Sequence, residues 1–368
     1  MTPHSTSRST PRSTPRSTVR TRVDAAAALL GLHARRDEPL APLTTYRVGG
    51  RAALFVEAES IDDLHRVALA KASTGLPVLA IGRGSNLLVA DSGFPGIVVS
   101  LAALAGEFEI GSPDRAGRVV VTAGGGVALP VLARRTAAAS VTGFEWAVGV
   151  PGSVGGAVRM NAGGHGSDMA AAVIDVDVFD LDRAIEIEQG SLRRIDAIDL
   201  GLRFRGSDLT DDQLVVSVRL GLHRGDRGAS ERQIAEIVRW RREHQPGGQN
   251  CGSVFVNPVP YEVTAGGLID GLGLRGLRIG TAWVSEKHAN FIQASDGGSA
   301  ADVRAVMEAV RDRVAAATGF VLRSEVRLVG FDTMTSAGTT DDATGETNDE
   351  RNETSTPGTS GPDSGPDE

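Results

Sequence analysis

Two side chains that could do chemistry lie two positions apart in the segment 250–258, NCGSVFVNP. Cys251 is the only cysteine in 368 residues, and as a thiolate it could act as a nucleophile. Ser253 could act as a nucleophile or give up a proton, whereas in a purely structural strand it would satisfy a backbone amide. The segment contains no histidine, so we expect Cys251 to be a packing residue beside a strand that ends at Pro258.

Two glycine-rich loops could bind an anion. Residues 80–86 (AIGRGSN) follow an apolar strand, and residues 148–164 (VGVPGSVGGAVRMNAGG) contain six glycines. Backbone amides in such loops converge on anionic oxygens, and glycine allows their close approach. A lone loop of this kind is more often a tight turn, but two beside strands predict a cofactor that contains a diphosphate. Neither loop has the lysine of a nucleotide-hydrolysing phosphate loop.

A third glycine pattern, GLGLRG at 271–276, matches the dinucleotide fingerprint G-x-G-x-x-G. It follows AGGLID, which reads as a helix, so the strand that precedes a true fingerprint is missing. We therefore expect these glycines to terminate a helix.

Hydrophobic periodicity predicts the elements that carry these loops. Three helices are each predicted by a capping serine followed three residues later by Asp or Gln, namely Ser60 with Asp63, Ser230 with Gln233, and Ser299 with Asp302. The last of these helices should end at Gly319. Strands are predicted at 54–58, 78–82, 97–100, 118–124, 174–181 and 215–222. Because strands dominate 50–222 and helices follow, the sequence predicts an α+β fold with a domain boundary in 223–230.

Length and composition limit the class of protein. A chain of 368 residues with 41% hydrophobic and 23% charged residues predicts two or three globular domains. A single cysteine excludes an intrachain disulfide, and no apolar run approaches a membrane span, so we expect a cytoplasmic protein that contacts no membrane. A net charge of −8 argues against nucleic acid as a partner. No metal is expected, and a monomer is predicted because no self-association stripe is evident.

The two ends of the chain differ in composition from the rest. Residues 1–22 contain five arginines and no acid, and residues 333–368 are rich in acid, Gly, Ser, Thr and Pro. Both segments lack the apolar residues that would offset the entropy of ordering. Both are therefore predicted to be disordered.

Seven separated motifs together resemble those of a known flavoenzyme family. They occur in order at 44–52, 80–99, 143–163, 203–209, 251–258, 265–292 and 324–331. Over residues 25–331 the chain resembles the compact type of the UDP-N-acetylmuramate dehydrogenases, also called UDP-N-acetylenolpyruvoylglucosamine reductases. The resemblance implies an FAD-binding domain of the vanillyl-alcohol-oxidase type over 23–225. It also implies a smaller α+β substrate-binding domain over 226–320 and a strand over 321–332 that returns to the active site.

The resemblance implies which residues hold FAD. The two glycine-rich loops would lie along its diphosphate, which agrees with their composition, and a third segment would lie near the flavin or the substrate. The positions are Tyr46, Arg47, Gly49, Arg83, Gly84, Ser85, Asn86, Leu87, Pro151, Gly152, Ser153, Gly155, Gly156, Ala157 and Asn161.

The implied reaction is the reduction of UDP-N-acetylglucosamine enolpyruvate to UDP-N-acetylmuramate in peptidoglycan precursor synthesis. NADPH would pass hydride to FAD, and reduced FAD would pass it to the terminal carbon of the double bond. Arg205 would stabilise charge on the substrate carboxylate, Glu325 would assist, and Ser253 would donate the proton. Taken alone, Arg205 could form a surface ion pair, and Glu325, which flanks Arg327 on an apparent strand, could form only a cross-strand pair.

The same resemblance implies substrate contacts at Asn257, Arg275, Lys287, His288 and Asn290. Phe204 and His244 depart from the family pattern, which commonly has tyrosine and lysine there, and this affects the expected contacts with the substrate. The alternative interpretation is a flavin-dependent alcohol or sugar oxidase of the same superfamily, which would carry different motifs in its substrate domain.

Overall fold

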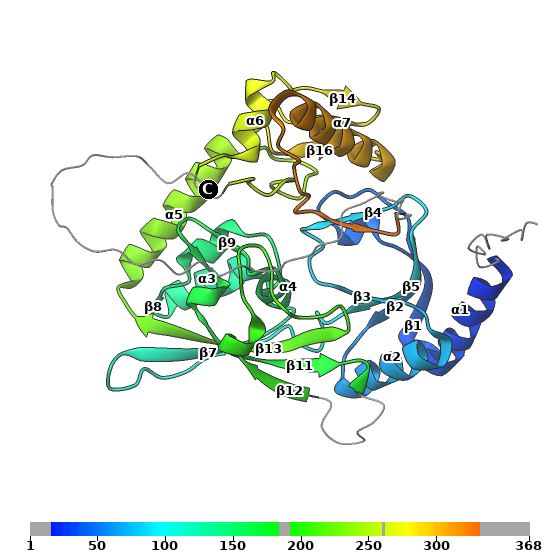
Figure 1. The fold of residues 1–368 in the computed structure, drawn as a ribbon. Helices are drawn as coiled ribbons and strands as arrows, with labels where there is room; N and C mark the ends of the chain where they lie inside the picture. Colours follow the sequence, from blue (N-terminus) through cyan, green and yellow to red (C-terminus); the bar gives the residue numbers. More distant parts are fainter. Residues whose placement is uncertain (1–15, 184–191, 260–261, 332–368) are drawn as a thin grey trace, which may run out of the picture.

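The computed structural model describes residues 16–183, 192–259 and 262–331 of the chain. These residues form three lobes, which lie at the right, the lower left and the top of Figure 1. The predictions of disorder for 1–15 and 333–368 lie outside the described residues. No helix within the described ranges has the length and apolar character that crossing a bilayer requires.

The first lobe is a four-stranded sheet with strand order β1-β2-β5-β3, and two helices flank it (Figure 1). Its elements are α1 (Arg16–Leu30), β1 (Ala34–Pro39), β2 (Arg51–Glu57), α2 (Ile61–Thr74), β3 (Val78–Ile81) and β5 (Phe94–Ser100). β1 pairs antiparallel with β2, whereas β2, β5 and β3 run parallel. Leu54, Val56 and Val99 of the sheet share a core with Leu64 and Val67 of α2. The strands predicted in this lobe are confirmed.

Residues 16–22 are helical, so the predicted disorder of the basic tail is wrong for this part of it. Helix α1 is anchored because Ala26 and Leu30 are buried in the core of the first lobe. The Arg22 guanidinium adds a second anchor, since it donates to the carbonyl oxygens of Thr74, over 2.5 Å, and of Gly75. The composition of residues 16–22 does not reveal that Arg22 bonds to the end of α2, so the helix could not be predicted from it.

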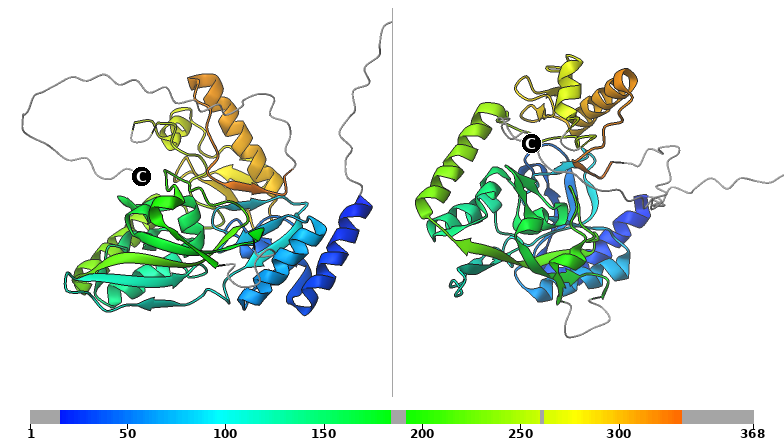
Figure 2. Two further views of the ribbon diagram at one scale, coloured as in Figure 1. Left: turned by 60° about the horizontal axis from the view of Figure 1, so that its bottom comes forward. Right: turned by 60° about the vertical axis from the view of Figure 1, so that its left-hand side comes forward.

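The second lobe is an antiparallel sheet with strand order β12-β11-β13-β7-β6, in which β8 also pairs with β13. Its strands are β6 (Phe108–Ile110), β7 (Arg118–Gly124), β8 (Val141–Thr142), β9 (Gly163–Gly164), β10 (Ser167–Asp168), β11 (Val173–Asp180), β12 (Leu192–Asp196) and β13 (Gln213–Arg224), with β9 and β10 forming a separate hairpin. Helices α3 (Leu129–Ala138), α4 (Val154–Met160) and α5 (Arg227–His244) share one core with this sheet, and Figure 2 shows α5 alongside the lobe. The strands predicted at 118–124, 174–181 and 215–222 are confirmed.

Helix α5 begins earlier than predicted and packs on the second lobe. Its N-cap is Asp226, whose carboxylate accepts a backbone N–H of the first turn. The predicted cap, Ser230, lies inside the helix, where it is buried and donates to Oε1 of Glu145 over 2.5 Å. Ile237 is buried in the core of the second lobe. The predicted domain boundary at 223–230 lies at the start of α5. It would assign α5 to the third lobe, whereas the helix packs in the core of the second lobe.

The third lobe is a small α+β unit with a three-stranded antiparallel sheet in the order β14-β15-β16. Its elements are α6 (Ala265–Gly271), β14 (Arg278–Ile279), β15 (Ala282–Val284), β16 (Ile292–Ala294) and α7 (Ala300–Thr318). Because α6 ends at Gly271, the fingerprint-like glycines terminate a helix as predicted. After α7 the chain returns to the first lobe, where β17 (Arg327–Val329) pairs parallel with β4 (Leu87–Val89).

Helix α7 has the predicted ends but not the predicted capping box. Ser299 caps its first turn, and Gly319, with a φ of 78°, ends it. The Asp302 carboxylate instead accepts two hydrogen bonds from Thr281. The Thr281 backbone N–H donates over 2.8 Å and the Thr281 hydroxyl over 2.7 Å. The first backbone N–H groups of α7 are also bonded to the carboxylate of Asp91, a residue of the first lobe.

Helix α2 begins with the predicted reciprocal capping box. The Ser60 hydroxyl accepts the Asp63 N–H over 3.3 Å, and the Asp63 carboxylate accepts the Ser60 N–H over 3.0 Å. We expect Ser60→Ala to lower the free energy of unfolding by about 1 kcal/mol, because a helix N–H loses its acceptor. Chemical denaturation measures this change. Ser73→Ala is the matched control at an exposed position of the same helix, and an equal loss in both variants would contradict the capping role.

Candidate active site

The three lobes meet around a branched cleft. A cavity of about 920 Å³ adjoins a second of about 290 Å³, and Arg83, Ser153 and Arg159 line both; we call these two together the main cleft. Two further cavities of about 360 and 410 Å³, the branch cavities, continue from it, because Arg205 and Ser253 line them and the main cleft alike. The arrangement suits a long ligand in the main cleft and a second ligand in the branch cavities.

Two glycine-rich loops approach each other closely in the main cleft. Gly82 lies so near the second loop that a Cβ at this position would be 2.2 Å from the Ser153 hydroxyl oxygen. Gly84 has a φ of +57°, and a Cβ there would be 2.2 Å from the Leu43 carbonyl oxygen. A side chain at either position would force the neighbouring segment to move. The glycines therefore set the shape of the cleft wall.

Most of the residues predicted to hold FAD line the main cleft. They are Arg47, Arg83, Gly84, Ser85, Asn86, Leu87, Pro151, Gly152, Ser153, Gly155, Gly156 and Ala157. The structure places three others elsewhere. Tyr46 is fully buried beside the thiol of Cys251, and Gly49 packs against the backbone of β4. Asn161 lines a branch cavity, and its amide donates to Asp168.

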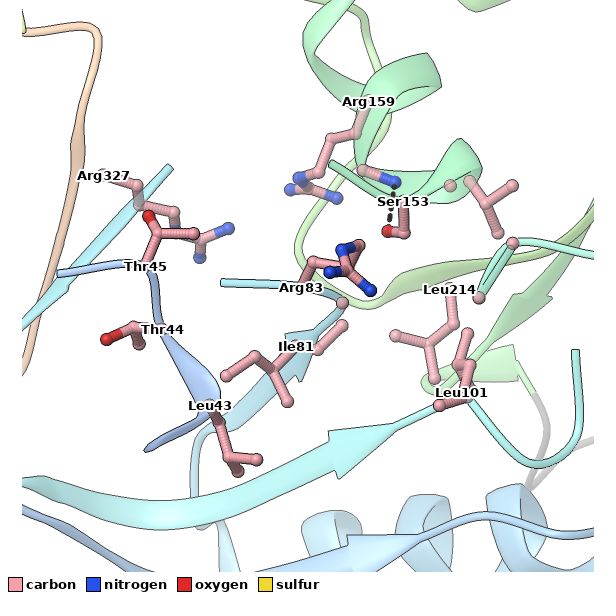
Figure 3. Close-up of a pocket in the computed structure, with 18 of the residues that line it drawn as sticks. Leu43, Thr44, Thr45, Ile81, Arg83, Leu101, Ser153, Arg159, Leu214 and Arg327 are labelled. Atoms are coloured by element: carbon pink, nitrogen blue, oxygen red, sulfur yellow. Dashed lines mark hydrogen bonds between the residues drawn. The ribbon is translucent and has the colours of Figure 1, made fainter. Parts of the chain in front are cut away.

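The main cleft has features that fit FAD. The Thr45 hydroxyl and the Gln249 side-chain oxygen line it, and both are buried with no hydrogen-bond partner among the described residues. A polar ligand would satisfy such atoms. Figure 3 shows Arg83, Arg159 and Arg327 around this cavity, where their positive charge suits a diphosphate.

Arg159 and Arg327 are candidate cofactor residues that the sequence analysis missed. Burial lowers the pKa of Arg159, and its guanidinium pairs with Asp211, which also pairs with Arg327 over 2.6 Å. The position of Arg159 inside the second glycine-rich segment, 148–164, was an available signal. Nothing in the sequence near Arg327 points to a ligand, so its place in the cleft follows from the return of β17 to β4.

Arg205, Ser253 and Glu325, which were predicted to be catalytic, come together where the main cleft meets the branch cavities. Nε of Arg205 lies 2.9 Å from Oε1 of Glu325, and Nη1 donates to the Gly163 carbonyl over 3.2 Å. The side chains of Arg205 and Glu325 are 25% and 18% exposed, so water screens their attraction only partly. The structure thus gives these three residues a shared site.

A tight turn carries Arg205. Arg203 and Gly206 exchange two backbone hydrogen bonds of 2.9 and 3.0 Å, and Arg205 between them has a φ of +58°. This left-handed conformation is uncommon for residues other than glycine, asparagine and aspartate. Backbone strain of this kind concentrates at ligand-binding sites, where the surrounding structure fixes it.

Ser253 lies on a segment that is clamped from both sides. The Val254 N–H donates to the Asn290 carbonyl and the Val254 carbonyl accepts the Glu325 N–H, both over 2.8 Å. The Asn290 side-chain amide accepts the Phe255 N–H over 3.0 Å and donates to the Phe255 carbonyl over 2.9 Å. Asn290 was predicted to contact the substrate; it lines the 360 Å³ branch cavity, and its buried side-chain amide also holds this segment.

Three other residues predicted to contact the substrate line the 360 Å³ branch cavity, namely Asn257, Arg275 and His288. Arg275 is held there by Asp270, with two N–O distances of 2.6 and 2.9 Å. This paired guanidinium keeps its position while part of its charge is neutralised. This branch cavity therefore offers the polar side chains of Asn257, Arg275 and His288 in addition to that of Arg205.

Lys287 lines none of the four cavities. Its ammonium group donates to the Arg242 carbonyl near the end of α5. The structure therefore gives Lys287 a different role from its predicted substrate contact, since it joins the third lobe to α5.

Cys251 is a buried packing residue, as predicted. Its side chain lies in the core of the third lobe, and burial raises the pKa of the thiol. A thiol with a raised pKa is almost entirely protonated at neutral pH, which makes it a poor nucleophile.

We expect the native protein at pH 7 to resist alkylation by iodoacetamide and to react at Cys251 once it is unfolded in denaturant. Mass spectrometry of the intact chain counts the adducts, because the protein has no other cysteine. Equal labelling rates with and without denaturant would show that the thiol is accessible and reactive in the folded state.

Comparisons with known proteins agree with this geometry. The sequence model of the FAD binding domain matches residues 52–184, and that of the UDP-N-acetylenolpyruvoylglucosamine reductase C-terminal domain matches residues 244–329. The chain is 42% identical to the UDP-N-acetylenolpyruvoylglucosamine reductase of Heliobacterium modesticaldum, over 80% of this chain and 90% of the relative. It is also 42% identical to that of a Synechococcus species (strain WH7803), over 80% of this chain and 93% of the relative.

A solved structure of a UDP-N-acetylenolpyruvylglucosamine reductase also matches this chain. The UDP-N-acetylenolpyruvylglucosamine reductase of Thermus caldophilus matches with a TM-score of 0.66 and 33% identity, over 80% of this chain and 99% of that chain. The predicted α+β fold with an FAD-binding domain is confirmed. Because the reductase model covers the third lobe, the alternative of an alcohol or sugar oxidase is not supported. The chain belongs to the UDP-N-acetylenolpyruvoylglucosamine reductase family of FAD-dependent oxidoreductases.

Proposed function

We propose that the protein reduces UDP-N-acetylglucosamine enolpyruvate to UDP-N-acetylmuramate, a peptidoglycan precursor, with NADPH as electron donor. The observation that carries this proposal is the convergence of Arg205, Ser253 and Glu325 where the main cleft meets the branch cavities. A cofactor in the main cleft and a substrate in the branch cavities would meet at these three side chains. The protein would act as a cytoplasmic monomer.

The reaction adds a hydride and a proton across the enolpyruvyl double bond. FAD held by the residues that line the main cleft would supply a hydride equivalent, drawn from NADPH, for the terminal carbon. The electron pair of the double bond then places negative charge on the adjacent carbon and its carboxylate. The Arg205 guanidinium would pair with that carboxylate and stabilise the charge. Protonation of the same carbon completes the lactyl ether.

The proton would come from the hydroxyl of Ser253. An unactivated hydroxyl is a weak acid, but a carbon with enolate character is a strong enough base to take its proton. Ser253 has a fixed position because Asn290 and Glu325 clamp the residues that follow it. Cys251 is a poor candidate for the same role because its thiol is buried.

Glu325 would act by positioning Arg205. Its carboxylate holds Nε of Arg205 at 2.9 Å and so fixes the guanidinium in the cleft. The backbone of Glu325 is fixed as well, because its N–H donates to Val254 over 2.8 Å and its carbonyl accepts the Asn86 amide over 2.9 Å. The same residue therefore links charge stabilisation by Arg205 to proton donation by Ser253.

Ser253→Ala should separate the two half-reactions. Reduction of the flavin by NADPH should proceed at nearly the wild-type rate, because it needs no proton from Ser253. Reoxidation by the enolpyruvyl substrate should slow by about 10²- to 10⁴-fold, the usual contribution of a positioned acid. Stopped-flow absorbance of the flavin measures each step.

The NADPH half-reaction of the same sample is the control for folding and cofactor binding. An equal loss in both half-reactions would mean that Ser253 is structural, contrary to the proposed role. A wild-type protein that is yellow, consumes oxygen with a simple alcohol and oxidises no NADPH with the enolpyruvyl substrate would overturn the proposed reaction itself.

Gly82→Ala should weaken FAD binding. The new methyl group would displace the Ser153 hydroxyl, which lines the main cleft and caps α4. Overpacking of this kind costs about 1–3 kcal/mol, which corresponds to roughly 5- to 150-fold in the dissociation constant. Fluorescence titration of the FAD-free protein measures this constant. Gly271→Ala is the matched control, since a Cβ there meets nothing within 4 Å, and equal weakening in both variants would contradict the mechanism.

A further inference from the structure

One carboxylate holds two arginines that reach the main cleft from different parts of the chain. Arg159 lies on α4 of the second lobe, whereas Arg327 begins β17, which pairs with β4. Both arginines line the 920 Å³ and the 290 Å³ cavity (Figure 3). Oδ1 of Asp211 pairs with Arg159, and Oδ2 of Asp211 lies 2.6 Å from Nη2 of Arg327. We call these three residues the Asp211 clamp.

The turn that carries Asp211 is fixed by other contacts. The Gln213 N–H donates to the Thr210 carbonyl over 3.1 Å, which closes the turn just before β13. The Asp212 carboxylate lies 2.6 Å from the Lys71 ammonium of α2. The Asp211 carboxylate takes part in neither contact, so its two ion pairs act on the arginines and are not required to hold the turn.

The two guanidinium groups of the clamp would repel each other without Asp211. Burial lowers the pKa of Arg159, the Asp211 carboxylate opposes this shift, and the positive charge of Arg327 adds to it. The side chains of Arg159 and Arg327 are 25% and 37% exposed, whereas that of Asp211 is 58% exposed, so the carboxylate is the member of the clamp most open to water. Because a guanidinium has five N–H donors, each arginine can pair with Asp211 and with a second anion.

We propose that Asp211 is a positioning residue for the cofactor, because it holds the Arg159 and Arg327 guanidinium groups in place to bind the diphosphate of FAD. The inference rests on the proposed function for the place of FAD in the main cleft. A carboxylate behind an ion-binding side chain fixes the orientation of that side chain and so prepares the site. The opposite effect, repulsion between the Asp211 carboxylate and the diphosphate, would weaken FAD binding, and the experiment below separates the two.

Asp211→Asn keeps the size of the side chain and removes its charge. We expect FAD to leave the loaded protein roughly three- to thirtyfold faster, because two partly exposed ion pairs each contribute up to about fivefold. The change in FAD fluorescence after dilution measures the release rate. The effect should shrink at high salt, because water and ions reach Asp211. Asp211→Glu, which keeps the charge, should retain slow release.

Asp296→Asn is the matched control. Asp296 is exposed and also lines the main cleft, but its carboxylate accepts the Gln249 side-chain amide over 3.0 Å. The variant removes the same charge from the same cavity without changing the clamp, so FAD release should be unchanged or slower. Circular dichroism verifies that each variant is folded.

Unchanged release from Asp211→Asn overturns the inference, and so does faster release that is equal in Asp296→Asn. Slower release from Asp211→Asn also overturns it and shows that the carboxylate repels the cofactor. Because residues that act as a unit are not additive, Asp211→Asn should have a smaller effect in an Arg159→Met or an Arg327→Met background. Full additivity in both backgrounds would mean that Asp211 acts through neither arginine.

The release measurement needs no enolpyruvyl substrate, so it separates failure of the inference from failure of the proposed function. Normal dependence of FAD release on the clamp, with no reduction of the enolpyruvyl substrate, contradicts the proposed function and leaves the clamp in place. A wild-type protein that retains no FAD contradicts both.

Discussion

The ion pair between Arg205 and Glu325 is the contact on which the junction of the cleft depends. Arg205 belongs to a turn of the second lobe, and Glu325 to the segment by which the chain returns after the third lobe. Two charges that are partly removed from water are stable only when they are paired, so each residue fixes the place of the other. The same returning segment holds Val254, next to Ser253, through the Glu325 N–H. One contact between lobes therefore orders the whole site.

Features that depend on neighbours in the sequence were predictable. Ser60 caps α2, and Ser299 and Gly319 mark the ends of α7, because capping involves groups within one helical turn. The apolar run at 118–124 corresponds to β7. The glycine-rich loops likewise located the wall of the main cleft, because close approach of backbone requires glycine.

Features that depend on distant partners were not predictable. Ser230 has the pattern of a cap, but its hydroxyl is bonded to Glu145, a residue of another element. Arg327 enters the main cleft only because β17 returns to pair with β4. Nothing in its local sequence distinguishes Ser253 from a structural serine, so its predicted role came from the resemblance of separated motifs. Phe204 and Trp240 likewise line the same branch cavities only because the fold brings α5 to the turn that holds Arg205.

Asp91 and the returning strand limit how the third lobe can move. Asp91 accepts the first N–H groups of α7, and β17 is paired with β4, so the third lobe is fastened to the first along one edge. Swinging it away at that edge would leave polar groups without partners, at about 1–3 kcal/mol for each buried one. On the opposite side, the Lys287 ammonium reaches α5 through a single carbonyl. If the third lobe moves, the contacts at the β4–β17 edge make that edge the hinge, and the cleft would widen beside α5.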